Sequence, residues 1–563
     1  MKFVFLIGLV FLLKETTTSQ AQNLENIKNE KPITLHGNVN ARAMFYDANG
    51  IPNRRKPFTY ILSGSPTLSI YGISMPFSFI FTEQERSFRQ PFNQIGVSPT
   101  YKWATLHAGY RNVSFSPYTL DGFTMLGGGF EIRPGKFYIG AMYGRLNRAV
   151  EVNQLTSNLQ AVSFSRKAFA AKIGYGNDTT HAYISFLKGS DDPTSIDYKK
   201  IDSVFVTPAE NLVFSAGGRI GFLKHFFVDG DAGVSIFTKN TQTAAFTDSS
   251  EIDIPNWLSS TMVINASSEL NKAFRTAIGY KGQRYGINVQ YRRIDPNFQS
   301  MGAYFFQNDL ENYTINPSAM LWKNKLKFNG SIGIQRDNLS GRKQATARRV
   351  ISSLSASATL SKSLGLDVSY SNYATSQAPI AVRFNDSLRV AQTTQNIAIT
   401  PRYIITGTGA SHVIIFSYNY MKLNDFSKLS AQRNLNSTTA FANYQISFIP
   451  SGISLTVGLT YGTLTSSLVN SSNRGFSFGV GKSFLKNALQ LRLNNSLVQT
   501  QQRSVSNPML THNLTASYKA NKHNAFGLNI YFLNNQGSKE SAAVGGYNKF
   551  TELRADVNYN FTF

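Results

Sequence analysis

The chain of 563 residues contains no cysteine. This absence excludes a disulfide framework and a thiolate metal site. It also removes the cysteine to which a lipoprotein anchor would be attached. We therefore expect a fold that is held together without covalent cross-links.

Long apolar runs are also missing. The run Phe3–Leu13 follows Lys2 and ends at Lys14, so it is well short of the roughly 20 residues that a membrane-spanning helix needs. A basic residue, a short apolar run and the small-residue site at 19–21 are typical of an export signal. We expect residues 1–21 to be a cleaved signal peptide, residues 22–32 a short periplasmic segment and residues 33–563 one folded domain.

Acidic residues are scarce, with 31 Asp and Glu against 56 Lys and Arg, which gives a formal net charge of +25. Loss of Lys2, Lys14 and Glu15 with the signal leaves +24. Such an excess of positive charge has to face something anionic. The candidates are lipopolysaccharide phosphates, an anion-attracting lumen and an acidic protein partner; no nucleic-acid partner is expected, because no nucleic-acid-binding signature accompanies the charge.

Aromatic residues and glycine are abundant, with 42 Phe, 27 Tyr and 42 Gly. Apolar and polar residues alternate with a period of two, which puts the two kinds on opposite faces of a strand. In the stretch 33–45, the odd positions are apolar or small, and the even positions include His36, Asn38, Asn40 and Arg42. The pattern returns in 285–292, 326–335, 364–371, 453–461 and 489–494. A soluble sandwich would need a polar outer face, so strands that show one face to lipid are favoured.

Short and long connections alternate between these strands, which is typical of transmembrane barrels. The predicted short turns are 134–136, 176–178, 223–225, 281–284, 323–325, 361–363, 449–452, 484–487 and 520–523. The predicted long loops are 188–210, 238–257, 337–348, 421–437, 463–474 and 535–548. This spacing predicts an all-β, closed, antiparallel up-and-down barrel of about 26 strands, with 24 as the lower bound. Two stretches, 63–100 and 257–271, show the pattern only weakly.

The last strand carries the most specific motif. Val557, Tyr559, Phe561 and Phe563 alternate with polar residues, and the chain ends on an aromatic ring. In this it resembles the outer-membrane β-barrel proteins of Gram-negative bacteria. The resemblance implies an integral outer-membrane location, contact with membrane lipid and lipopolysaccharide, and recognition of this strand by the barrel-assembly machinery during insertion.

Residues that could carry chemistry are scattered. No two of the seven histidines share a catalytic or metal-binding spacing, and no nucleophile elbow is present. Acidic clusters at 191–197 and 248–253 lack the spacing of a defined calcium loop. The glycines Gly127–Gly129 are not followed by a helix whose N-terminus could bind phosphate. We expect no catalytic residues, no metal and no cofactor, and we expect these glycines to mark a close approach of strands.

The alternate positions of a strand, all odd or all even, share one face and are called one parity below. In each strand, the parity that carries the polar residues is predicted to face the lumen. Eight of them are basic: Arg42, Lys172, Arg219, Arg275, Arg292, Lys327, Arg492 and Arg554. Four acidic residues oppose them: Asp229, Asp231, Asp367 and Asp556. Two interpretations are equally supported: an anion-attracting conduit, and an interior in which charges pair with one another.

A barrel of this width would leak if it were empty, because 16–18 strands already leave an aqueous channel. Loops of some twenty residues could narrow its mouth but hardly seal it. We therefore predict a non-enzymatic barrel that is the membrane subunit of a larger envelope export or assembly complex, or a gated conduit, with a protein partner or a collapsed shape closing the lumen. The alternative is a free-standing, porin-like channel for anionic or neutral solutes; a surface adhesin is less favoured.

Overall fold

The computed structural model describes residues 32–83, 93–150, 162–196, 206–244, 246, 256–303, 308–342, 345–379, 390–425, 434–467, 469–502, 505–537 and 549–563. These residues form β-strands and their connections, with one short helix, α2 (Asn256–Ser259), among them. In these ranges no helix combines the length and apolar character that crossing a membrane requires. The predicted signal peptide lies outside the described residues.

The strands follow one another in chain order. They are β1 (Ile33–His36), β2 (Asn38–Asn49), β3 (Phe58–Gly64), β4 (Thr67–Ile70), β5 (Ile73–Thr82), β6 (Gln94–Val97), β7 (Thr100–Tyr101), β8 (Ala104–Asn112), β9 (Thr124–Ile132), β10 (Phe137–Asn147), β11 (Ser165–Gly176), β12 (His181–Asp192), β13 (Glu210–Phe222), β14 (Phe226–Thr238), β15 (Ser268–Lys281), β16 (Tyr285–Ile294), β17 (Leu310–Leu321), β18 (Leu326–Arg336), β19 (Ala345–Thr359), β20 (Leu364–Pro379), β21 (Val390–Thr406), β22 (Ala410–Asp425), β23 (Leu435–Phe448), β24 (Ile453–Ser466), β25 (Asn470–Phe484), β26 (Leu489–Gln502), β27 (Val505–Lys519), β28 (Asn524–Asn535) and β29 (Phe550–Thr562).

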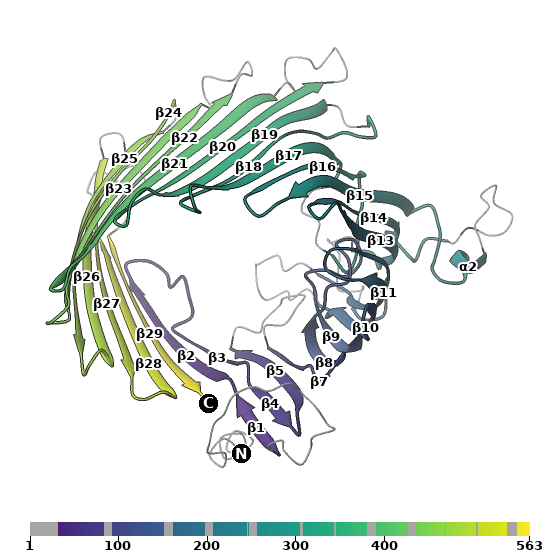
Figure 1. Cartoon of the computed structure of the whole chain (residues 1–563), viewed down its shortest axis with the longest axis horizontal. Coiled ribbons are helices and arrows are strands. Elements are labelled where there is room, and N and C mark those ends of the chain that lie inside the picture. The colour runs from purple at the N-terminus through teal and green to yellow at the C-terminus, as the bar shows by residue number, and fades with distance from the viewer. Residues whose placement is uncertain are drawn as a thin grey trace.

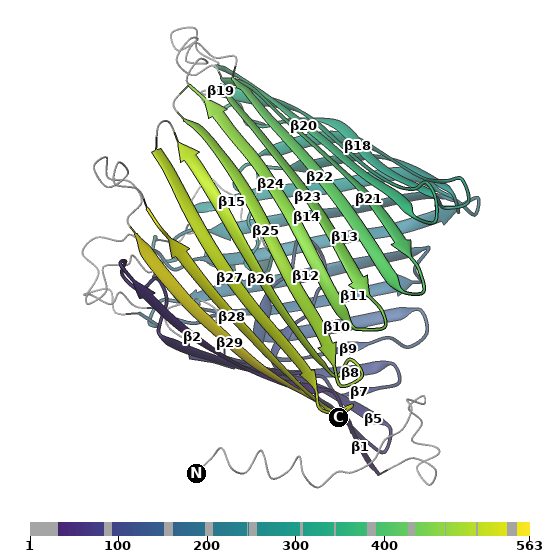
Figure 2. The same ribbon diagram turned by 90° about the vertical axis from the view of Figure 1, so that its left-hand side faces the viewer.

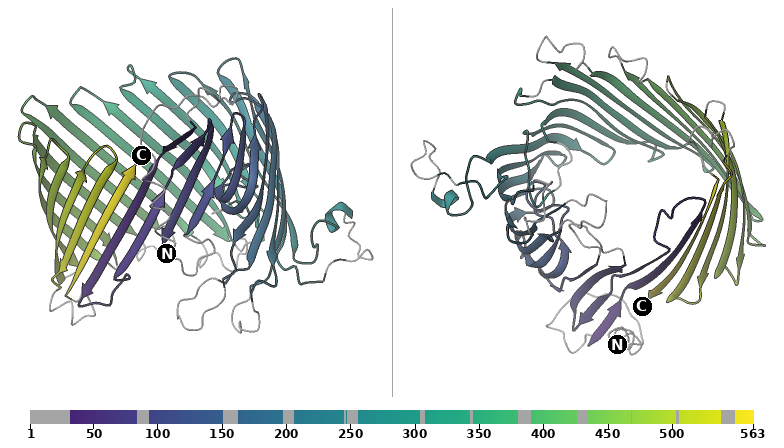
Figure 3. Two further views of the ribbon diagram at one scale, coloured as in Figure 1. Left: turned by 90° about the horizontal axis from the view of Figure 1, so that it is seen from below. Right: turned by 180° about the vertical axis from the view of Figure 1, so that it is seen from behind.

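The sheet closes on itself, because β2 pairs antiparallel with β29 from Asn38 opposite Thr562 to Asn49 opposite Thr551. Three barrel strands are interrupted once, at the β1/β2, β3/β4 and β6/β7 breaks, so the 29 segments make a closed barrel of 26 strands. This confirms the predicted fold and strand number. Figure 1 shows the ring, and Figure 3 shows β29 in yellow beside β2 in purple at the seam.

The interruptions explain the weak alternation of residues 63–100. Pro66 stands between β3 and β4, and Pro99 stands between β6 and β7. Proline has no N–H to give to a ladder, so pairing stops there and resumes beyond it. No hairpin is lost in this stretch. The other weak stretch, 257–271, contains most of α2 and the start of β15.

Short turns and longer loops lie on opposite rims, and the C-terminus lies on the rim of the short turns (Figure 2). The turns at 323–324 and 486–487 use left-handed residues, with φ of 56° and 67° at Lys323 and Asn324 and 54° and 70° at Lys486 and Asn487. Such residues let two strands reverse direction within a few positions. In outer-membrane barrels, the rim of short turns faces the periplasm.

Four predicted loops run into strand: β12 extends to Asp192 within 188–210, β19 begins at Ala345 within 337–348, and the other two are affected more strongly. The loop predicted at 463–474 is almost entirely strand, because β24 runs to Ser466 and β25 begins at Asn470. The loop predicted at 421–437 is likewise shortened by β22 and β23. The start of β25 is polar on both faces, so alternation cannot separate it from loop, and the end of β22 keeps its alternation through Met421 and Leu423. The backbone ladder continues in both places.

The outer face of the barrel is apolar. Ile184, Ile278 and Ile334 are 62%, 55% and 60% exposed, and Leu270 and Ile332 are exposed on the same strand faces as Ile278 and Ile334. The inner face carries mostly small and polar residues. Most of the fully buried hydrophobic residues lie on one sector of the inner wall, between Val113 and Leu310.

Closure at the seam depends on Gly37, which has a φ of 140° and pairs with Phe563 through two backbone hydrogen bonds of 3.0 Å. A Cβ at this position would lie 2.6 Å from the carbonyl oxygen of Ser65.

Gly37→Val should lower the free energy of unfolding by about 1–3 kcal/mol, measured as denaturant-induced loss of the compact gel mobility of the folded barrel. Gly409→Ala is the control, because its Cβ would meet no atom within 4 Å. Equal stability of G37V and G409A would contradict this account of the seam.

Candidate functional site: the covered sector of the inner wall

Two long loops fold into the barrel instead of away from it. The β8–β9 loop (residues 113–123) and the described parts of the β16–β17 loop (residues 295–303 and 308–309) both lie against the inner side of the wall beside β9–β13 (Figure 1). Their apolar residues pack on inward side chains of the strands. The larger cluster joins Val113, Phe115, Leu120, Phe123 and Met301 of the loops to Met125, Met142, Leu146, Ala168, Ala170, Leu187, Ala209 and Val213. The smaller cluster is Tyr118, Ala273, Ile294, Phe298 and Leu310.

The two loops come from opposite sides of this sector and meet over it. The backbone N–H of Asp121 donates to the carbonyl oxygen of Gly302 over 2.8 Å, and the hydroxyl of Ser300 donates to the carbonyl oxygen of Thr119 over 3.0 Å. Asp121 and Ala303 also form an isolated β-bridge. The loops therefore hold each other as well as the wall.

Buried polar side chains fasten the loops to the strands. Hydroxyl pairs join Ser116 to Ser215 over 2.6 Å and Thr119 to Ser185 over 2.7 Å. Asn211 of β13 is fully buried and accepts a 3.0 Å hydrogen bond from the backbone N–H of Met301. A buried polar group is costly unless it is paired, so these contacts fix the loops at defined positions.

Glycines in the strands make room for the loop side chains. A Cβ at Gly233 would lie 2.7 Å from Cβ of Tyr118, and one at Gly189 would lie 2.9 Å from the sulfur of Met301. A Cβ at a further glycine, Gly140, would lie 2.9 Å from a ring carbon of Phe115. The inner wall in this sector is therefore shaped to receive a second layer.

A network of charged and aromatic side chains accompanies the loops on the same wall. The guanidinium of Arg275 contacts Asp231 at 2.7 Å and Asp229 at 3.2 Å, and the hydroxyl of Tyr183 donates to Asp231. Lys172 lies over the ring of Tyr183, 4.2 Å from its centroid. Tyr118 faces this group from the β8–β9 loop, and burial, with a contribution from Asp231, raises its pKa to about 12. The phenol therefore stays protonated at neutral pH.

A second group extends the network toward the short-turn rim. Glu131 accepts hydrogen bonds from Tyr138 at 3.1 Å and Arg133 at 2.7 Å, and it contacts the ring of His107 at 3.2 Å. The hydrogen bond to Glu131 raises the pKa of Arg133, which lies in the turn after β9. Lys172 links the two groups, because it also lies 5.3 Å from the centroid of the Tyr138 ring.

The register places all eight predicted basic residues on the parity opposite to the exposed apolar residues, but their surroundings differ. Arg42, Arg275 and Arg554 form ion pairs with acidic residues, the first and third sharing Asp556. Lys172 and Arg219 lie over aromatic rings. Arg292, Lys327 and Arg492 form no ion pair within the described ranges. The fourth predicted acidic residue, Asp367, pairs with Arg402, which is not among the eight predicted basic residues.

The C-terminal motif lies on the outer face of β29. Val557 and Tyr559 pair with Leu528 and Phe526 of β28, and the rings of Phe561 and Phe563 lie 5.4 Å apart. These rings stand beside the seam that closes the barrel. Recognition of this strand by the assembly machinery stays a prediction.

The histidines and acidic residues do not assemble elsewhere in the described ranges, where no group of three or more metal-ligating side chains occurs. Asp191 pairs with Arg166 at 2.7 Å. The remaining acidic residues of the predicted clusters, apart from Asp192, lie outside the described residues. At Gly127, a Cβ would lie 1.9 Å from the carbonyl oxygen of Tyr143, so the triple glycine does mark a close approach of two strands.

Comparisons with known proteins give fold likenesses at very low identity. No family model and no curated protein matches the chain. Among solved structures, the FrpB iron transporter from Neisseria meningitidis is 11% identical with a TM-score of 0.35, over 97% of this chain and 83% of that one. The P pilus usher (PapC) translocation pore is 8% identical with a TM-score of 0.36, over 94% and 99%. Acinetobacter baumannii OccAB4 is 10% identical with a TM-score of 0.31, over 72% and 100%.

The class of the protein follows from the barrel. A closed antiparallel ring pairs every strand with two others, and its apolar outer face matches hydrocarbon, so the strands can cross a bilayer. The chain is an integral outer-membrane β-barrel protein.

Asn211 allows a test of the loop attachment. Asn211→Leu removes the hydrogen bond to Met301 and those that the side-chain amide donates to Ser235 and Ile236. Loss of these buried partners should cost about 1–3 kcal/mol and release the β16–β17 loop. Chymotrypsin should then cleave after Phe298, which is fully buried in the native barrel. Asn494→Leu, on the inward parity of β26, is the matched control and should leave Phe298 protected; continued protection in N211L would show that Asn211 does not hold the loop.

Proposed function

We propose that this chain is the membrane-embedded conduit of a larger envelope complex for export or assembly, and that a protein partner occupies its lumen at rest. One observation carries the proposal: the barrel has 26 strands, yet among the described residues the inward-folded loops cover only one sector of its wall. Barrels of 16–18 strands already enclose an aqueous channel. A wider ring that is lined on one side needs a further component to keep the membrane tight.

The uncovered wall suits such a component. From β18 to β29, the inward parity carries mainly Ser, Thr, Asn, Gln and Gly, interspersed with Lys327, Arg402 and Arg492. Polar side chains of this kind can form hydrogen bonds with water or with a polar protein surface, and they do not select one over the other. Lys327 and Arg492, which form no ion pair in the described ranges, favour an acidic partner segment or an anionic cargo.

The same cations support the alternative, a free-standing porin-like channel for anionic or neutral solutes. Arg292, Lys327 and Arg492 would raise the local concentration of anions in an open lumen. The two functions differ in what accompanies the barrel. A conduit of a complex is isolated with partners in fixed proportion, whereas a porin is isolated alone and conducts.

Purification from native membranes in mild detergent, followed by planar-bilayer recording, separates the two. We expect stoichiometric partner proteins and low conductance, with conductance rising once the partners are stripped away. A large, steady conductance from protein that was isolated without partners would overturn the proposal in favour of the porin.

Ion selectivity tests the role of the basic lumen. The double variant K327E/R492E should shift the reversal potential of the stripped barrel toward cation preference, because it places two negative charges on the water-facing wall. Lys482→Glu is the matched control: Lys482 pairs with Leu491, the neighbour of Arg492, but points outward over the ring of Phe484. An equal shift from K482E, or none from K327E/R492E, would contradict lumen placement of these cations.

A further inference from the structure

A pair of polar side chains lies on the outer face of the barrel inside its apolar belt. Asn495 is the seventh of 14 residues in β26, and His512 is the eighth of 15 in β27. The two are opposite each other in the sheet, and Nδ1 of His512 lies 2.6 Å from Oδ1 of Asn495. Both side chains share the outward parity of Leu497 and Leu514, which are 46% and 37% exposed.

Apolar residues surround this pair on every side. Along β26 its neighbours on the same face are Leu493 and Leu497, and along β27 they are Leu510 and Leu514. In the lateral direction, Phe478 pairs with Asn495, and Phe532 pairs with His512 with ring centroids 6.1 Å apart. The pair is therefore displaced from both polar rims, where outward charges such as Lys272 and Lys482 are placed.

Hydrocarbon cannot satisfy the hydrogen bonds that this pair leaves open. If the oxygen of Asn495 accepts from Nδ1–H of His512, the neutral ring keeps a vacant acceptor at Nε2, and the amide keeps two donors at Nδ2. Neither atom has a partner among the described residues. Polar side chains within a membrane mark functional contacts, because lipid offers nothing to pair with them.

The open groups are complementary to a second copy of themselves. A twofold axis along the membrane normal would bring the same depth of two barrels face to face. The Nδ2–H of Asn495 in one copy could then donate to Nε2 of His512 in the other, and the reverse contact would follow by symmetry. We propose that the face formed by β25–β28 is a homodimer interface, centred on Asn495 and His512.

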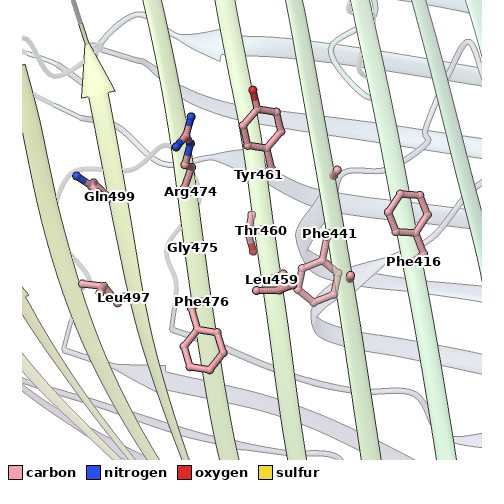
Figure 4. Close-up of a pocket in the computed structure, with 12 residues that line it drawn as sticks. Phe416, Phe441, Leu459, Thr460, Tyr461, Arg474, Gly475, Phe476, Leu497 and Gln499 are labelled. Carbon is pink, nitrogen blue, oxygen red and sulfur yellow. The ribbon is translucent and has the colours of Figure 1, made fainter. Parts of the chain in front are cut away.

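The adjoining surface is hollowed in a way that fits such a contact. A groove beside the pair is lined on the outer face by Phe416, Leu459, Phe476 and Leu497, with Arg474 and Tyr461 toward its far end (Figure 4). Under the twofold axis, the groove side of one barrel opposes the Phe532 side of the other. An aromatic residue entering an apolar groove adds close packing to the polar contact at the centre.

The absence of native cysteine makes the interface testable by single-cysteine cross-linking in intact outer membranes. Leu497→Cys and Leu514→Cys, on either side of the pair, should each give a covalent dimer of this chain. Ile184→Cys, on the outer face of β12, is the control and should stay monomeric.

The polar contact is tested in the same background. N495L/H512L should reduce the L497C and L514C cross-linking at least fivefold while the barrel still folds, because leucine suits lipid at both positions. Retained folding is checked by compact gel mobility. Three outcomes would overturn the proposal: no adduct at either position, an adduct with a different protein, or dimer yield that N495L/H512L leaves unchanged.

Discussion

The backbone of this chain has to satisfy its own hydrogen bonds, because the hydrocarbon around it offers none. A sheet meets this requirement only when it has no edge, which is why the pairing of β2 with β29 matters more than any single side-chain contact. The seam brings the two ends of the described chain into register over twelve residue pairs. Its last rung, between Gly37 and Phe563, depends on a backbone conformation that few residues other than glycine adopt.

Closure alone would give a single-layered wall, and part of this barrel is built differently. Over β9–β16 the inner wall carries a second layer made by two loops, with an apolar core between the layers. The hydrophobic effect therefore acts twice in this protein, once toward lipid on the outside and once toward the loops on the inside. Buried hydroxyl and amide groups give the inner layer its defined position.

Alternation and turn spacing predicted the barrel and its strand number, because both depend only on local sequence. The inner layer was missed, since contacts such as Met301 with Asn211 join residues far apart in the chain. A signal was nevertheless present: inward positions that are polar elsewhere are Ala168, Ala170 and Gly233 in this sector. Likewise, the pairing of Asp367 with Arg402 requires the register between β20 and β21, which alternation does not fix.

The unequal thickness of the wall has a mechanical consequence. The resistance of a plate to bending rises steeply with its depth, so the arc from β9 to β16, with its buried filling, behaves as a stiff brace. Within the described residues, the arc from β18 to β29 is one sheet deep and bends more easily. A change in the outline of the ring would therefore be taken up by the thin arc, while the braced arc keeps its form and turns as a unit.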